Sequence, residues 1–158
     1  MTRENDGYFH TGDGIRNKSI AFVTIRIYRI SHEMRELPPV KSRQAVIALD
    51  TDKRISWTML RDAGGERLKG ILREAFAANG YSDQATIAQF LSPFEEGLQE
   101  GQQVVISYDS ASKTTTAGVR GTARTATLAG VEAMQAVWSI WFGKSAQPDL
   151  ADALISRI

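Results

Sequence analysis

"GDGIRNKSIAFVTIRIYRIS", residues 12–31, begins as a glycine-rich turn and continues as a β-strand. Successive strand residues point to opposite faces, so one face carries the apolar residues Val23, Ile25 and Ile27. The other face is mixed and carries Phe22, Thr24, Arg26, Tyr28 and Ile30. Arg16 lies just upstream, in the glycine-rich corner of residues 12–14. A mixed face suits either ordinary sheet surface or the wall of a cleft in which Arg16 and Tyr28 meet a ligand.

The rest of the chain predicts an α+β fold. Strand patterns cover residues 20–31, about 44–49, 54–60 and 102–109, and the stretch 114–128 predicts a hairpin that turns at Arg120–Gly121. Helical periodicity covers 65–80 with Gly80 as a C-terminal cap, then 87–91, 130–143 and a short last helix from Asp149. Ser92–Glu95 has a capping-box pattern that predicts a kink or a restart. This order indicates a mainly antiparallel sheet covered on one face by helices.

Composition limits the classes of function. A chain of 158 residues can bury a sizeable core, and we expect residues 1–158 to form a single domain. Its 42% apolar residues, 23% charged residues and net charge of +1, without a basic stripe, indicate a soluble globular protein with no nucleic-acid partner. The absence of cysteine excludes disulfides, thiolate catalysis and cysteine-based zinc sites. No apolar run approaches the ~18 residues of a membrane span, and the N-terminus lacks a secretory signal. The sequence leaves the compartment open: we expect a soluble protein, either cytoplasmic or, if a signal has been removed, periplasmic.

No motif indicates an enzyme, a metal site or a cofactor. The two histidines, His10 and His32, are far apart in the sequence, and His32 and Glu33 point to opposite faces of one strand. "GDG" at 12–14 resembles a phosphate loop only weakly and is more simply a turn. Trp138 and Trp141 are three residues apart on one helix, which favours core packing over sugar stacking.

Five segments nevertheless occur in the order of a known family. They are "TGDGIRNKS" (11–19), "IRIYRISHEM" (25–34), "RISWTMLRDAGGERL" (54–68), "FEEGLQEGQQVVISYD" (94–109) and "SIWFGKSAQPDLADALI" (139–155). The sequence resembles the chalcone isomerase-like superfamily, in particular its bacterial and fatty-acid-binding branch rather than the true chalcone isomerases. The resemblance implies an open-faced β-sandwich: a large, mainly antiparallel sheet, a layer of helices, and a ligand cleft between them.

The resemblance also implies a set of site residues. The cleft arginine of the family corresponds to Arg16, and Tyr28 stands where true isomerases have a threonine, as in the fatty-acid-binding branch. The lysine, tyrosine, second lysine and asparagine of the isomerases correspond to Met59, Leu68, Ile71 and Ala75. The threonine–methionine pair of the C-terminal helix corresponds to Ile140 and Trp141. The polar groups of the isomerases are therefore mostly replaced by apolar side chains.

Ring closure of a chalcone requires a positioned phenolate and stabilisation of a developing enolate, which apolar side chains do not supply. The implied ligand is a fatty acid or a similar apolar carboxylate, with its head group clamped by Arg16 and hydrogen-bonded by Tyr28. Simpler interpretations remain: Arg16 stabilises its own turn, Tyr28 packs under helices, and Leu68, Ile71 and Ala75 form the core stripe of a helix. We therefore keep three functions open, of which we favour non-catalytic binding. The others are an isomerase or intramolecular lyase with altered chemistry that still uses Arg16, and a scaffold protein with a vestigial cleft.

Overall fold

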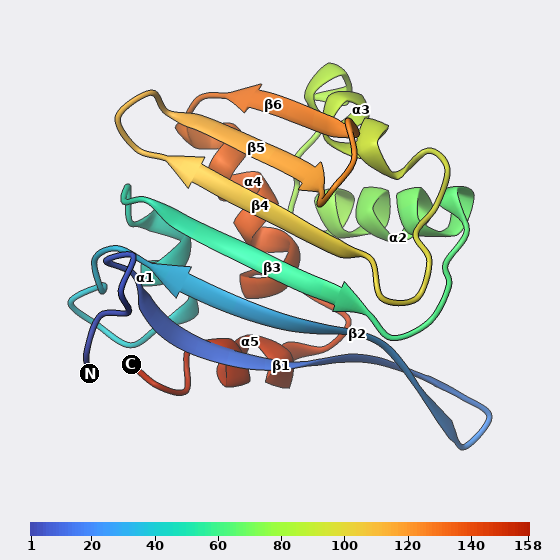
Figure 1. Cartoon of the computed structure of the whole chain (residues 1–158), viewed down its shortest axis with the longest axis horizontal. Helices are drawn as coiled ribbons and strands as arrows, with labels where there is room; N and C mark the ends of the chain where they lie inside the picture. Colours follow the sequence, from blue (N-terminus) through green and yellow to red (C-terminus); the bar gives the residue numbers. More distant parts are fainter.

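Six β-strands form one antiparallel sheet in the computed structural model, which describes residues 1–158. The strands are β1 (Phe9–Ile20), β2 (Val23–Met34), β3 (Lys53–Met59), β4 (Gln103–Asp109), β5 (Thr114–Val119) and β6 (Thr125–Ala129), and their order in the sheet is their order in the chain. The β1–β2 hairpin is the longest and extends beyond the other strands (Figure 1). The hairpin expected at Arg120–Gly121 joins β5 to β6 and is confirmed.

The helices lie against one face of this sheet (Figure 1). They are α1 (Arg43–Ala48), α2 (Gly65–Ala78), α3 (Gln84–Leu91), the 3₁₀ turn η1 (Ser92–Phe94), α4 (Val131–Phe142) and α5 (Pro148–Leu154). Alternate strand residues such as Ile30, Ile55 and Ile106 meet the helices in a cluster of 33 buried residues, which includes most of α4. The predicted α+β fold, an open-faced sheet covered by helices, is confirmed. None of the helices has the length and hydrophobicity needed to cross a bilayer.

Residues 43–48 form helix α1, so the strand expected at about 44–49 is wrong. The Ser42 side chain caps the helix by accepting a hydrogen bond from the Ala45 amide (3.0 Å), and Val46 and Ile47 are buried. Two adjacent apolar residues in a short segment fit a strand or a helix equally well. The N-terminal cap decides between them.

The predicted turn at residues 12–14 is also wrong, because these residues belong to β1. A Cβ atom at Gly12 would lie 2.1 Å from the carbonyl oxygen of Ala153, and one at Gly14 would lie 2.7 Å from Cδ1 of Leu150. Both contacts are with α5. The glycines therefore allow α5 to pack directly on the backbone of β1, rather than allowing the chain to turn.

The true turn falls within the stretch that the alternating pattern predicts as one strand. Ala21 and Phe22 link β1 to β2 with φ angles of 45° and 74°. Turns of this kind usually contain Gly, Asn or Asp, and this one contains none of them. At the other predicted break, Ser92 is the C-terminal cap of α3 and not the N-terminal cap of a new helix: its hydroxyl donates to the carbonyl of Gln89, and η1 continues directly from α3.

A buried hydrogen-bond chain starts from His32 on β2. Nε2 of His32 accepts from the indole N–H of Trp138 (3.0 Å), so the proton of the neutral ring lies on Nδ1. Nδ1 then donates to Oγ1 of Thr11 (2.7 Å), which donates to the carbonyl of Leu154 (2.7 Å). Burial, together with the charge of Lys53, lowers the pKa of His32 to about 3. This neutral chain ties β1, β2, α4 and α5 together.

Lys53 on β3 is buried beside this hydrogen-bond chain and caps the C-terminal end of helix α1. Its Nζ donates to the carbonyls of Val46 (2.7 Å), Ile47 (3.3 Å) and Leu49 (3.0 Å). These carbonyls at the end of α1 lack helical partners, and a cation there is favourable. Burial lowers the pKa of Lys53 to about 7, while the charge of Asp50 opposes that shift.

Candidate ligand-binding site

The β1–β2 ladder places the two predicted ligand-binding groups side by side. Arg16 and Tyr28 are direct cross-strand partners, so their side chains share the face that is turned toward the helices. The register shifts immediately after this pair, between Arg16 and Asn17. Such a bulge bends and twists a hairpin. The pair therefore lies where the hairpin starts to leave the body of the molecule.

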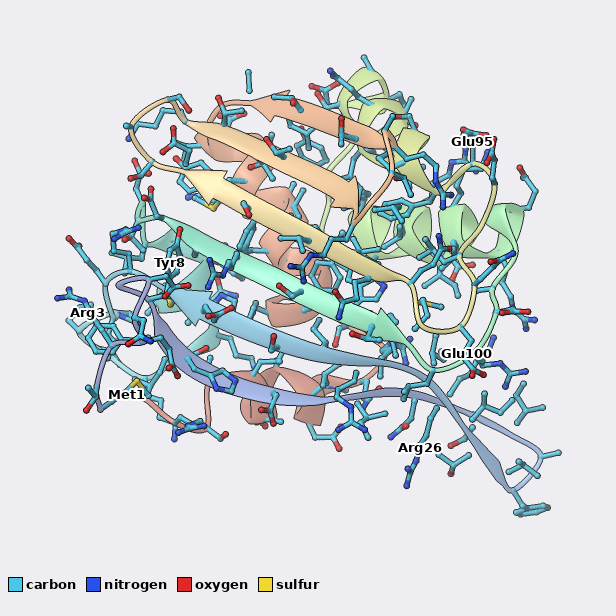
Figure 2. The ribbon with its side chains drawn as sticks, in the orientation of Figure 1. Met1, Arg3, Tyr8, Arg26, Glu95 and Glu100 are labelled. Atoms are coloured by element: carbon cyan, nitrogen blue, oxygen red, sulfur yellow. The ribbon has the colours of Figure 1, made fainter.

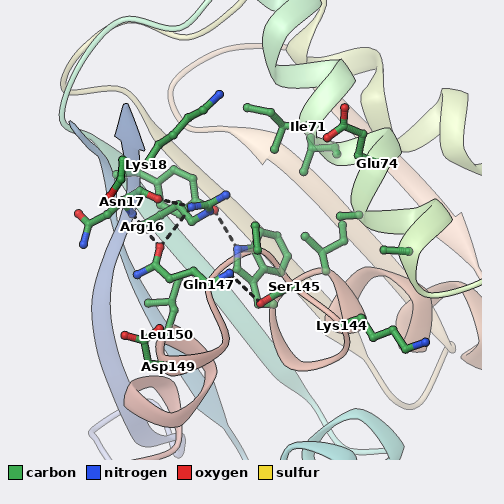
Figure 3. A pocket seen from close by; sticks show the side chains of 18 of the residues that line it. Arg16, Asn17, Lys18, Ile71, Glu74, Lys144, Ser145, Gln147, Asp149 and Leu150 are labelled. Atoms are coloured by element: carbon green, nitrogen blue, oxygen red, sulfur yellow. Dashed lines mark hydrogen bonds between the residues drawn. The ribbon is translucent and has the colours of Figure 1, made fainter. Parts of the chain in front are cut away.

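A cleft of about 750 Å³ opens beside this pair (Figure 3). Small-molecule sites usually measure roughly 300–1,000 Å³. The base of the β1–β2 hairpin forms one wall and α2 the opposite wall, and the end of α4 and the segment 144–150 complete the site. A small ligand fits a space of this size.

Gln147 holds Arg16 in place at the cleft. Nη1 of Arg16 donates to the carbonyl of Asn17 and to Oε1 of Gln147 (3.2 Å). The same Gln147 oxygen accepts from the amide of Asn17 (2.8 Å), and its nitrogen donates to the carbonyl of Ile15 (2.9 Å). Nε and Nη2 of Arg16 make no hydrogen bond within the protein. An oriented guanidinium with free N–H groups is suited to an anion.

Trp141 positions Tyr28 in a comparable way. The indole N–H of Trp141 donates to the Tyr28 hydroxyl (2.9 Å), and the Tyr28 ring stacks on Trp57 with 4.9 Å between ring centroids. Burial raises the pKa of Tyr28, although Trp141 and Arg16 both oppose the shift. The hydroxyl therefore stays neutral and, since its oxygen already accepts, keeps its proton free to donate.

Six of the eight residues that the sequence suggests for ligand binding line this cleft: Arg16, Tyr28, Ile71, Ala75, Ile140 and Trp141. Met59 and Leu68 do not. Met59 is 1% exposed within the sheet core, and Leu68 is buried one turn before Ile71 on α2. Leu68 points in nearly the same direction as Ala75, two turns later on α2, so its place along the helix rather than its direction keeps it out of the cleft.

The cleft is more polar than the sequence suggests, since only 9 of its 19 lining residues are hydrophobic. Lys18, Glu74, Lys144 and Asp149 bring charges to it, and Figure 3 shows Glu74 on the α2 side, away from Arg16. Gln147 is the most informative residue that sequence reasoning misses. It is 131 residues from Arg16 in the chain, and no local pattern connects the two.

Comparison with known families identifies the fold. A family described as chalcone isomerase-like matches residues 2–155. The chain belongs to the chalcone isomerase-like family. Comparison with curated proteins finds no match. Among solved structures, this chalcone isomerase-like chain is similar to the fatty-acid binding protein AtFAP1 of Arabidopsis thaliana, with a TM-score of 0.72 and 15% sequence identity over 96% of this chain and 87% of that one.

Proposed function

We propose that the cleft binds a fatty acid or a similar apolar carboxylate without transforming it. The observation that carries the proposal is the pair formed by Arg16 and Tyr28. One offers free guanidinium N–H groups and the other a free phenolic proton, and each is held by a second residue, Gln147 or Trp141. Two donors oriented in advance suit the two oxygens of a carboxylate.

The remaining walls suit an aliphatic chain. Ile71 and Ala75 on α2, with Ile140 on α4, present apolar surface to the cleft. The tail of the ligand would lie against them and gain up to about 0.8 kcal/mol for each buried methylene. A fatty-acid-binding member of the same fold is in keeping with this assignment.

The test is calorimetric titration of the protein with dodecanoic acid, its methyl ester and dodecanol. Charge-assisted hydrogen bonds contribute about 1.5–3 kcal/mol, so the ester and the alcohol should bind roughly tenfold or more weakly than the acid. The Arg16→Ala variant should bind the acid more weakly than the wild type by a similar factor, and should bind the ester with almost unchanged affinity. Arg16→Lys should recover only part of the lost affinity for the acid, because an ammonium cannot form the planar fork. Equal binding of acid and ester would show that no carboxylate clamp exists.

A further inference from the structure

The apex of the β1–β2 hairpin exposes apolar side chains that no part of the chain covers. Five large hydrophobic residues are exposed in the whole protein, and three of them, Ile20, Phe22 and Val23, lie within four consecutive residues. Phe22 is fully exposed. Most exposed apolar side chains are scattered singly and need no explanation. A cluster at the tip of the most protruding element does need one (Figure 1).

The backbone conformation of Phe22 also argues against a role of this residue in stabilising the fold. Its φ of 74° lies in the left-handed region, where a bulky side chain is strained. Asn or Gly would fit this turn without strain. Phe22 thus combines a strained backbone with a fully solvated ring, and it makes no compensating contact within the molecule.

Positive charge surrounds this apolar apex. Between residues 14 and 32 the chain has four basic residues, Arg16, Lys18, Arg26 and Arg29, and no acidic one. Lys18 and Arg26 flank the apex on its two strands, are exposed and have no ion-pair partner. Figure 2 shows the Arg26 side chain pointing away from the sheet.

From this arrangement we infer that the hairpin apex, residues 18–26, docks on an anionic lipid bilayer. An aromatic and aliphatic tip flanked by Lys and Arg matches the interfacial region of a bilayer, where the ring enters the acyl boundary and the cations contact lipid phosphates. A second copy of the chain is a poorer occupant. A four-residue tip offers only a few hundred Å², against the roughly 1,000 Å² that a stable protein interface needs.

The hairpin apex lies next to the cleft, which links membrane docking to ligand entry. Lys18, Ser19 and Thr24, which belong to the hairpin apex, also line the cleft. Docking would therefore place the cleft beside the membrane surface, from which an amphipathic acid could enter it. This consequence rests on the proposed function, whereas the docking itself does not.

The experiment is flotation of the ligand-free full-length protein with vesicles of phosphatidylcholine alone or with 30% phosphatidylglycerol. The wild type should bind the anionic vesicles and lose binding at high salt. Phe22→Asn should weaken binding about tenfold or more while raising the melting temperature, because Asn fits the turn. Unfolding thus cannot mimic the loss. Arg26→Glu should weaken binding at least about fivefold.

Val40 and Lys41 provide a matched control, since they place an exposed apolar residue beside an exposed cation in the loop before α1, at the other end of the sheet (Figure 1). Val40→Asn and Lys41→Glu should leave binding unchanged. Failure of the wild type to float, equal binding to neutral vesicles, or a dimer in sedimentation that Phe22→Asn dissociates would each overturn the inference. Fatty-acid titration in vesicle-free solution tests the proposed function separately.

Discussion

Two aromatic residues of the cleft act through one hydroxyl group. Trp141 donates to the Tyr28 oxygen, and Tyr28 in turn has a proton to offer a ligand. Removal of the hydroxyl removes one neutral hydrogen bond from the complex. Removal of the indole N–H still allows the Tyr28 hydroxyl to donate to a ligand, but the hydroxyl is then no longer held in one orientation.

Tyr28→Phe should therefore cost about 0.5–1.5 kcal/mol of dodecanoate binding free energy, and Trp141→Phe should cost less. The double variant should bind about as weakly as Tyr28→Phe alone, because both changes act through the same group. Calorimetric titration of the three variants measures this coupling. Tyr81→Phe, which removes a hydroxyl outside the cleft, is the control. Fully additive losses would mean that Trp141 contributes independently of Tyr28.

The residues that line the cleft also set an expectation about catalysis. Ile71 and Ala75 offer no polar group to a phenolate, and ring closure of a chalcone needs one. The purified protein should not accelerate conversion of a chalcone to a flavanone above the uncatalysed rate, followed by loss of chalcone absorbance. Saturable turnover that disappears in Arg16→Ala would contradict this expectation.

At this scale, sequence reasoning places residues well where a strand ladder or a helix face fixes their direction. Arg16 and Tyr28 meet because they are cross-strand partners, and Ile71 and Ala75 share one helix face. Met59 shares the sheet face of Tyr28, and Leu68 shares the helix face of Ala75, but both are buried in the core, which direction alone does not predict. Gln147 could not be predicted, since only the tertiary structure brings it to Arg16.

Among the elements, α5 packs directly on the backbone of β1. A methyl group at Gly12 has no space, since its Cβ would overlap the Ala153 carbonyl at 2.1 Å. Gly12→Ala must displace α5, and overpacking of this kind costs about 1–3 kcal/mol or more. The melting temperature should fall by several degrees.

Gly70 on α2 supplies the matched control, because nothing lies within 4 Å of its added Cβ. Gly70→Ala should stabilise the helix by about 0.5–1 kcal/mol. Differential scanning calorimetry compares the two variants. If Gly12→Ala melts like the wild type, α5 is not seated on β1 as described.

The elements that sequence patterns miss share a physical cause. Helix α1 is short, and its stability depends on Ser42 at one end and Lys53 at the other, of which the second is a tertiary contact. The apex at Ala21 and Phe22 carries no turn residue at all. The long helices α2 and α4 and the strands β3 to β6 are predicted because their periodicity extends over several residues.

For the whole molecule, the buried His32 links stability to pH. Its pKa is about 3 in the folded protein, against 6.5 for a free side chain, so the unfolded chain takes up the proton first. Stability is therefore lost as the pH falls from 6.5 toward 3, at up to about 1.4 kcal/mol per pH unit. His32→Gln keeps an acceptor for Trp138 and does not titrate. Its unfolding free energy, measured in urea between pH 7 and 4, should decline less steeply than that of the wild type. Parallel declines would mean that the pKa of His32 is not lowered in the folded protein.

Helix α4 crosses back under the sheet from β6, and α5 then packs on β1, so the two ends of the chain lie on one side of the molecule (Figure 1). Thr11 near the start of β1 accepts a hydrogen bond from the Arg157 amide, and both termini lie together in Figure 1. The two ends are thus close enough to be joined by a linker, and the chain could then begin and end at another loop without loss of contacts. A circular permutant opened at the hairpin apex, with a short linker joining the present ends, would keep all five strand ladders and the seat of α5 on β1. The contacts that hold this fold together therefore depend little on which element comes first in the chain.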